Sequence, residues 1–235
     1  MSDSVLFVLT SHAQLGDTGQ KTGTWLEELA AAYYVLVDAG YDVALASVRG
    51  GAAPLDPASL DDPWLTDAGR RFQADAKASG ALATTARLAD VSPDGFDAIY
   101  FVGGAGAAWD FPVDADVRRL AEGVDRAGGI VSGVCHGVLG LTTAQTLDGQ
   151  PLVAGREVTA VSNKEEELTT FDKVVPVLPE SRLVELGGRY GCAAEPFGAY
   201  VAVDGNLVTG QNPASAPFVA RVVAERLSAR ADAPA

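Results

Sequence analysis

Short apolar segments alternate along the chain with longer segments whose apolar positions recur every three to four residues. The short segments predict strands at Val5–Thr10, Asp42–Ser47, Ala98–Val102, Ile130–Val134 and Val158–Val161, and a hairpin from Ala199–Val203 to Asn206–Thr209 across an Asp204-Gly205 turn. The long segments predict helices at Thr24–Ala39, Asp114–Ala127, the residues after Cys135, Glu180–Tyr190 and Ala216–Leu227. This order is typical of a parallel sheet covered on both faces. We therefore predict an α/β fold, a flavodoxin-like, mostly parallel sheet sandwiched by helices.

The sequence has no repeat, low-complexity tract or long linker, which predicts a single domain over residues 1–235. Four prolines interrupt residues 50–95, and we expect an irregular insertion there. Ser215 is the predicted N-cap of the last helix, with Pro217 in its first turn. The tail 228–235 is predicted to fray.

Charge and composition exclude several classes of function. Lys and Arg number 17 against 31 Asp and Glu, a formal net charge of −14, which repels nucleic acid and anionic lipid. The N-terminus lacks the basic region of a signal peptide, and no apolar run approaches the roughly 20 residues of a membrane span. Two cysteines and two histidines make neither a disulfide framework nor a zinc cluster. We expect a cytoplasmic protein without a metal or cofactor.

The strongest chemical signal is a nucleophile elbow centred on Cys135. Gly133 and Gly137 flank it in the pattern Gly-x-nucleophile-x-Gly, directly after the apolar strand Ile130–Val134. Glycine suits such a tight turn, which pushes the nucleophile into strained backbone angles and places its side chain at the carboxyl end of the sheet. A buried structural cysteine in a strand–turn–helix connection is the alternative, since the motif is short.

A second signal comes from the helix predicted after the first strand. Its apolar face consists of side chains at core spacing: Trp25, Leu29, Ala32 and Leu36. Glu28 lies along the edge of this face, whereas Thr24 and Glu27 have capping-box spacing. A buried carboxyl group must be paired or protonated, and a protonated Glu28 beside a thiolate would lower the thiol pKa. In the alternative, the helix is slightly rotated and Glu28 reaches solvent. The spacing of the apolar residues alone favours this alternative.

Other candidates follow the ends of predicted strands. The loop Gly103-Gly104-Ala105-Gly106 could present backbone N–H groups to an oxyanion, but it matches neither a P-loop nor a dinucleotide fingerprint. His136 is a general base, an orienting group or simply a polar residue at a helix start. His12 is a binding-loop residue at most, and Cys192 is structural. The run 164–167 is a solvated face unless one of its carboxylates turns toward the site.

Together these features resemble the ThiJ/PfpI family of the class I glutamine amidotransferase-like superfamily, in particular its heat-shock chaperone and glyoxalase III branch. The resemblance covers nearly the whole chain. It is carried by short motifs in a fixed order: Leu9-Thr10-Ser11, Thr22-Gly23, Trp25–Glu28, Ala46-Ser47, Gly50-Gly51, Leu55-Asp56-Pro57, Trp109-Asp110, Val134–Gly137, Gly205–Gly210 and Asn212–Ser215.

The resemblance implies roles for individual residues. Cys135 matches the family nucleophile, His136 its neighbouring histidine, and Glu28 the acidic residue on the first helix. Glu166 matches a third acidic residue that orients His136, although Glu165 and Glu167 are adjacent. The backbone N–H groups of Gly104 and His136 match the oxyanion hole. The remaining candidates for oxyanion or substrate binding are Gly103, Ala105, His12 and Trp109.

The resemblance also implies a cofactor-independent glyoxalase III that converts methylglyoxal to lactate, active as a homodimer on a small carbonyl substrate. Some relatives in this branch are described as deglycases or holding chaperones. One departure stands out: many relatives have His in the glycine loop where this chain has Ala105, so its activity could be reduced or its substrate changed. All of this chemistry assumes that the protein keeps the Cys135 sulfur ionised at neutral pH.

Two alternatives remain from the sequence. One is a cysteine-dependent hydrolase, amidase or isonitrile-hydratase-like enzyme of the same superfamily. A glutaminase proper is disfavoured because no histidine follows His136, where that class has one. The other alternative is a redox-sensitive stress protein or holding chaperone that senses oxidants through Cys135.

Overall fold

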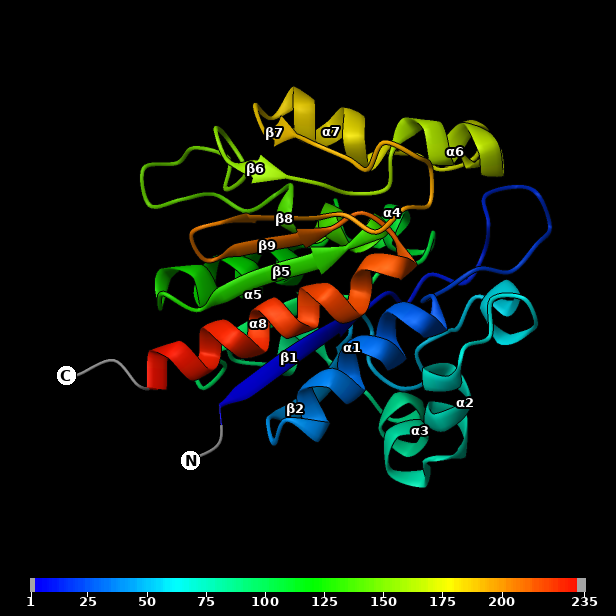
Figure 1. The fold of residues 1–235 in the computed structure, drawn as a ribbon, viewed down its shortest axis with the longest axis horizontal. Helices are drawn as coiled ribbons and strands as arrows, with labels where there is room; N and C mark the ends of the chain where they lie inside the picture. Colours follow the sequence, from blue (N-terminus) through cyan, green and yellow to red (C-terminus); the bar gives the residue numbers. More distant parts are fainter. Residues whose placement is uncertain (1–2, 232–235) are drawn as a thin grey trace.

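A seven-stranded sheet forms the centre of the protein, whose computed structural model describes residues 3–231 (Figure 1). Its strands, in spatial order, are β3 (Ala86–Arg87), β2 (Asp42–Ser47), β1 (Ser4–Leu9), β4 (Ala98–Phe101), β5 (Ile130–Val134), β9 (Leu207–Gly210) and β8 (Val201–Asp204). All neighbours are parallel except β8 and β9, which form the predicted antiparallel hairpin. The predicted α/β class and mostly parallel sheet are confirmed.

Helices cover both faces of this sheet. The α-helices are α1 (Leu26–Asp38), α2 (Asp67–Ala74), α3 (Ala76–Ala83), α4 (Ala107–Asp110), α5 (Ala115–Arg126), α6 (Asn163–Thr169), α7 (Pro179–Glu185) and α8 (Ala216–Ala231). Short 3-10 helices span Pro57–Leu60, Leu88–Asp90, Cys135–Leu141, Phe171–Lys173 and Pro213–Ser215. Helices α1 and α8 lie side by side on one face, and α5 packs on the other (Figure 1). None of the helices within residues 3–231 is both long and apolar enough to cross a bilayer.

The alternation of side chains along β1 explains why its sequence is continuously apolar. Val5, Phe7 and Leu9 belong to the core cluster under α1 and α8. Leu6 and Val8 point to the opposite face, in the cluster under α5. A strand that is buried on both faces needs apolar residues at every position, as parallel strands between two helical layers do.

Two predictions in the region after the elbow are wrong. The strand expected at Val158–Val161 is β6 (Glu157–Val158), and it lies outside the main sheet, paired in parallel with β7 (Arg189–Tyr190). The helix expected over Glu180–Tyr190 ends earlier, at Glu185. Gly187 has a φ of 83°, a left-handed conformation that ends helices and is suited to glycine. The residues beyond it are therefore free to form β7.

Residues 50–95 are more regular than predicted. Helices α2 and α3 occupy the stretch between Pro63 and Pro93, and β3 adds an edge strand to the main sheet. Each helix begins at a capping residue: the Thr66 hydroxyl accepts from the N–H of the third helical residue of α2, and the Asp75 carboxylate accepts from two N–H groups of α3. The prolines interrupt the segment without preventing helices between them.

The C-terminal predictions also need correction. Helix α8 extends through Ala231, so residues 228–231 are helical rather than frayed, whereas 232–235 lie outside the described residues. Ser215 lies directly before α8, at the predicted position, and also ends the preceding 3-10 helix, where its hydroxyl accepts from the N–H of Tyr200 at 3.1 Å. It therefore anchors the segment before β8.

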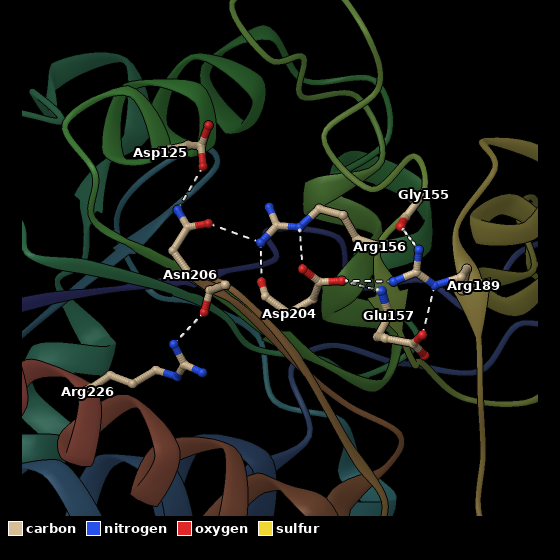
Figure 2. A network of polar contacts seen from close by, with 9 residues as sticks. Asp125, Gly155, Arg156, Glu157, Arg189, Asp204, Asn206 and Arg226 are labelled. Atoms are coloured by element: carbon tan, nitrogen blue, oxygen red, sulfur yellow. Dashed lines mark hydrogen bonds and ion pairs between the residues drawn. The ribbon is translucent and has the colours of Figure 1, made fainter.

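A polar network attaches the small sheet to the hairpin (Figure 2). Arg189 Nε donates to Glu157 at 2.8 Å, and its Nη2 lies 3.2 Å from an Asp204 carboxylate oxygen. Arg156 Nη2 donates to Asn206 Oδ1 at 3.1 Å, and Asn206 in turn donates to the Asp125 carboxylate at 2.8 Å. Single exposed ion pairs contribute little, but a network that spans β6, β7, the hairpin turn and α5 fixes their relative positions.

Replacing Gly137 with Ala tests the close approach of β4 to the 3-10 helix after Cys135. The added Cβ would lie 2.2 Å from the Phe101 carbonyl oxygen, a backbone atom that cannot rotate away. We expect a loss of about 1 to 3 kcal/mol in the free energy of unfolding, measured by urea denaturation. Gly80→Ala is the matched control, because no atom within 4 Å would meet its Cβ. In helix α3 that control should be neutral or stabilising by up to about 1 kcal/mol, and equal effects of the two variants would contradict the prediction.

Candidate active site

Cys135 begins the 3-10 helix directly after β5, with a φ of 55°. A non-glycine residue in this left-handed region is strained, which is the geometry expected of a nucleophile elbow. Gly137 is required by the approach of Phe101, and a Cβ on Gly133 would also be tight, at 3.3 Å from Val138 Cα. The predicted elbow is therefore present at the carboxyl end of the sheet.

His136 is positioned by a carboxylate from a distant part of the chain. Its Nε2 lies 2.6 Å from Glu166 Oε1, and both side chains are buried. Its Nδ1 lies 3.5 Å from the Cys135 sulfur. The nearby Glu166 carboxyl favours the imidazole tautomer whose proton is on Nε2, which leaves the Nδ1 lone pair facing the thiol. The contacts thus arrange Cys135, His136 and Glu166 in the order of a nucleophile, a base and an orienting acid.

The structure distinguishes the three adjacent glutamates of α6. Ser162 and Glu165 form a capping box at the start of this helix, which turns Glu165 inward. Glu166 is completely buried and faces His136, whereas Glu167 is exposed and pairs with Lys164 at 3.1 Å. The run predicted as a solvated face thus contributes two of its carboxyl groups to the interior.

Glu28 is completely buried, so the alternative in which it reaches solvent is wrong. Its carboxyl group and Cys135 meet above Gly103: a Cβ on that glycine would lie 2.2 Å from Glu28 Oε2 and 2.9 Å from Cys135 Cβ. The absence of a side chain at position 103 therefore allows the acid and the nucleophile to approach each other.

The predicted capping box at the start of the same helix is absent. Trp25 is the N-cap of α1, and no side chain caps it. Glu27 instead accepts a hydrogen bond from the Thr66 hydroxyl, at the residue that caps α2. This contact fixes the start of α1 against the segment that carries Trp64.

Burial controls the protonation of the Glu28–Cys135 pair. Burial raises the pKa of Glu28 to about 8, while hydrogen bonds with the Cys135 thiol and the Gly103 N–H act in the opposite direction. Burial also raises the pKa of the Cys135 thiol, as do the charges of Glu28 and Glu166, whereas the His136 N–H lowers it. This direction is opposite to the predicted one, in which the surrounding protein lowers the thiol pKa and keeps the sulfur ionised.

The protonation of Glu28 changes its effect on the thiol. With a pKa of about 8, Glu28 is mainly a neutral acid at pH 7. A neutral carboxyl group has no charge to repel a thiolate, and its O–H can donate a hydrogen bond to the sulfur. The carboxylate form of Glu28, which raises the thiol pKa, becomes the major one only above about pH 8. The two groups therefore titrate as one unit that shares a proton.

These residues open into one cavity of about 170 Å³. Its floor consists of Glu28, Cys135, His136 and Glu166, and Gly104 and Ala105 form part of its wall. The other walls are largely apolar or aromatic and also include residues after β9: Trp25, Trp64, Val161, Phe171, Phe197, Pro213 and Ala214, with the polar Glu165, Thr169 and Asn212. Loops that follow β4 and β5 thus converge with α1 and α6, as expected where parallel strands end.

The glycine loop fits the proposed oxyanion role in its backbone conformation. Gly104 has a φ of 109°, and a Cβ there would lie 2.5 Å from the Trp25 nitrogen, so only glycine is accommodated. The N–H of His136 points to the Cys135 sulfur. Gly103 does not line the cavity. Its lack of a side chain leaves space for the Glu28 carboxyl group.

His12 and Trp109 do not line the cavity. Their rings stack on each other with centroids 4.7 Å apart and planes 4° from parallel. The next residue, Asp110, accepts from the Thr10 hydroxyl and the Ser11 N–H at 2.8 Å, and burial raises its pKa to about 6. This motif therefore anchors the loop after β1 rather than contacting a ligand.

Sequence reasoning missed the aromatic walls and the role of Glu165. The helical spacing predicts a core position for Trp25, and Trp64 lies in the segment predicted to be irregular. Phe171 and Phe197 carried no motif. For Glu165, the only indication in the sequence is the Ser162-x-x-Glu165 spacing of a capping box. No group of three or more His, Cys, Asp or Glu side chains that could hold a metal occurs within residues 3–231.

The chain is similar in sequence to several known proteins. The sequence profile of the DJ-1/PfpI family matches residues 21–226. Glyoxalase 3 of Candida albicans is 29% identical over 222 residues, which cover 90% of this chain and 93% of that protein. Probable glutathione-independent glyoxalase hsp3103 of Schizosaccharomyces pombe is 34% identical over 139 residues, but these cover only 56% of this chain and 53% of that protein.

Solved structures give the same result. Rapid Encystment Protein 24 kDa of Francisella tularensis superposes with a TM-score of 0.91 at 35% identity, over 96% of this chain and 99% of that one. Glyoxalase III from Candida albicans superposes with a TM-score of 0.87 at 28% identity, over 94% and 95% of the two chains. The similarity thus extends over nearly the whole chain.

Replacing Glu28 with Gln tests whether this residue donates to the sulfur at neutral pH. We expect alkylation of Cys135 by iodoacetamide to slow by about three- to tenfold at pH 7, because the donating acid is lost. The difference should narrow above pH 8, where Glu28 becomes a carboxylate. Both proteins carry Cys192→Ser, which removes the exposed second thiol. Faster alkylation of the Gln variant at pH 7 would contradict this prediction, because it would show that Glu28 of the parent protein is mainly a carboxylate at that pH.

The same substitution has a pH-dependent effect on stability. Glu28 loses its proton near pH 4.5 in the unfolded chain but near pH 8 in the folded protein. Its contribution to stability is therefore complete below the lower value and is lost as pH rises through the higher one, by about 3 to 5 kcal/mol in total. We expect the Tm of Glu28→Gln, relative to the parent, to be about 5 to 10 °C higher at pH 9 than at pH 5.

Calorimetry at both pH values measures this difference. Glu167→Gln is the control for a general loss of negative charge, since that carboxylate is exposed. A relative Tm that does not change with pH, or that changes equally in the control, would contradict the raised pKa of Glu28.

Proposed function

The chain belongs to the DJ-1/PfpI family, and from this premise we propose that it is a cofactor-independent glyoxalase III that converts small 2-oxoaldehydes to 2-hydroxy acids, with methylglyoxal giving lactate. One observation carries the proposal. A strained Cys135, a buried Glu28 and the His136–Glu166 pair face the same cavity. This set supplies a nucleophile, an acid–base group beside it and a second base that can receive the thiol proton.

The charge of the cavity favours a neutral substrate. The carboxylates of Glu165 and Glu166 line it beside the carboxyl group of Glu28, and none of its lining residues within the described structure is Lys or Arg. A carboxylate or phosphate ligand would therefore meet negative groups without a cation to pair with. A 2-oxoaldehyde is neutral and its product is an anion, so the same charges assist product release.

The first step is addition of the thiol to the aldehyde. His136 Nδ1 accepts the thiol proton, and the imidazolium is stabilised by Glu166 at its other nitrogen. The sulfur bonds to the aldehyde carbon, and the oxygen becomes an oxyanion that the N–H groups of Gly104 and His136 can bind. The proton held by His136 then moves to this oxygen, which gives a hemithioacetal.

The second step moves hydrogen between the two substrate carbons. The ionised form of Glu28, which is the minor form at pH 7, removes the C–H proton of the hemithioacetal carbon and leaves an enediolate. Glu28 returns this proton to the neighbouring carbon, and the hydroxyl proton of the hemithioacetal carbon moves to the neighbouring oxygen, which gives a 2-hydroxy thioester. One carbon is thereby oxidised and the other reduced, so no external oxidant is required. Water hydrolyses the thioester, which releases the hydroxy acid and restores the thiol.

The raised pKa of Glu28 suits this role. A carboxylate whose conjugate acid has a pKa of about 8 is a stronger base than an ordinary glutamate, and its acid form is available to return the proton. Ala105 lies in the cavity wall and is 2% exposed. Its methyl group has no acid–base function, so Glu28 and His136 carry the proton transfers.

Two broader proposals rest on the family resemblance. We propose that the protein acts in the cytoplasm, where a free, reactive thiol persists; Cys135 and Cys192 are both free thiols. We also propose a homodimer, as in other members of the family.

The purified protein is expected to convert methylglyoxal to lactate without glutathione and in the presence of a metal chelator. Cys135→Ala should abolish turnover, and Glu28→Gln should lower kcat by about 10² to 10⁴, the range of a general base. Lactate formation measured with lactate dehydrogenase detects the product. Cys192→Ser should retain activity, because that thiol is exposed and does not line the cavity.

Absence of lactate with the wild-type protein, or full activity of Cys135→Ala, would overturn the proposal. A wild type that instead hydrolyses amide or ester substrates would favour the hydrolase of the same superfamily.

A further inference from the structure

Four aromatic side chains surround the cavity above its acidic floor: Trp25, Trp64, Phe171 and Phe197. They come from the start of α1, the segment before α2, the 3-10 helix after α6 and the segment before β8. Trp64 and Phe197 are 51% and 46% exposed, which is unusual for large apolar side chains. Exposed aromatic rings around a concave site are typical of ligand recognition.

From this arrangement we infer that the enzyme selects 2-oxoaldehydes with a planar, apolar substituent of about the size of a phenyl ring over methylglyoxal. The inference rests on the proposed function, since it assigns the substrate class of the same site. The aldehyde end reacts at Cys135, and the substituent occupies the aromatic part of the cavity.

The size of the cavity is consistent with such a substituent. Its volume is about 170 Å³. A cavity of roughly 150 Å³ lined by apolar side chains is large enough to hold a benzene ring. Methylglyoxal, whose substituent is a single methyl group, would leave most of this space unfilled. A phenyl ring would replace water at the exposed faces of Trp64 and Phe197 and gain aromatic contacts.

The aromatic walls are fixed before a ligand arrives. Trp25 and Trp64 contact each other edge to face, with ring centroids 5.9 Å apart. The Phe171 ring, just after α6, lies 6.4 Å from the His136 ring between centroids. A ligand ring would therefore pack against side chains whose positions are already determined, which reduces the entropy cost of binding.

Phe197 is held in place by Glu165. Its φ is 63°, a left-handed conformation that is strained for phenylalanine. Its N–H donates to Glu165 Oε1 at 2.8 Å. The same buried carboxylate accepts from Asn212 at 2.8 Å and from Gln211 at 2.9 Å. Glu165 is thus a positioning residue that connects α6, the residues after β9 and the strained backbone at Phe197.

Binding of unreactive analogues tests the inference separately from catalysis. The probes are 2-hydroxyacetophenone and hydroxyacetone, two neutral hydroxyketones that lack the aldehyde and differ in phenyl against methyl. Titration calorimetry with the wild type should give a Kd at least about tenfold lower for the phenyl compound. The ratio of kcat/KM for phenylglyoxal over methylglyoxal should favour the phenyl substrate by a similar factor.

Variants identify the residues responsible. Phe197→Ala and Trp64→Ala should each narrow the ratio of the two Kd values by about fivefold. Phe218→Ala is the matched control: Phe218 lies on α8, is 45% exposed and does not line the cavity, so the ratio should stay unchanged. If Phe197→Ala does not fold, Trp64→Ala from a separate segment carries the test.

Glu165→Gln tests the positioning role. It should narrow the Kd ratio in the same way as Phe197→Ala, and adding it to Phe197→Ala should narrow the ratio no further. A further loss of phenyl selectivity in the double variant would show that Glu165 does not act through Phe197.

The outcomes separate the two proposals. Equal affinity for the two hydroxyketones in the wild type, or an unchanged ratio in both aromatic variants, would overturn the inference even if methylglyoxal is converted to lactate. Selective binding of the phenyl compound without any glyoxalase activity would leave the aromatic site standing and overturn the proposed reaction.

Discussion

The burial of a carboxyl group against a thiol is the constraint on which the site depends. Glu28 and Cys135 can meet only because residue 103 has no side chain, and Gly103 is available only because β4 ends beside the elbow. Once they are buried together, neither can hold its charge as it would in water. Proton transfer within this pair, and to His136, is therefore coupled to every step that the sulfur undergoes.

Local patterns predicted the parts of the site that depend on local geometry. Gly133 to Gly137 predicted the elbow because the turn itself requires small residues, and the spacing around Glu28 placed it at the margin of the buried face. The burial of Glu28 depends on β4 and β5, which pack against the helix and lie 70 to 106 residues farther along the chain. Spacing within one helix cannot contain that information, and it favoured the wrong alternative.

Contacts between distant segments account for the other errors. The protonation of Cys135 depends on Glu28 and Glu166, which come from either side of it in sequence and together with burial reverse the predicted direction. Strand β7 forms because Gly187 ends α7 and β6 offers an edge. Trp64 lines the cavity from the segment before α2, a helix that lies within the region predicted to be an irregular insertion.

Strain is concentrated where the ligand would bind. Within residues 3–231, the non-glycine residues with positive φ are Cys135, Thr170 and Phe197. Cys135 and Phe197 line the cavity, and Thr170 lies between Thr169 and Phe171, which also line it. Each such residue lowers the stability of the fold by about 1 to 3 kcal/mol. The burial of the Glu28 carboxyl group lowers it further. A fold selected for stability alone would have no reason to place these costs around one cavity. Their common location indicates that the rest of the structure, the double-sided core above all, stabilises a site whose geometry is unfavourable by itself.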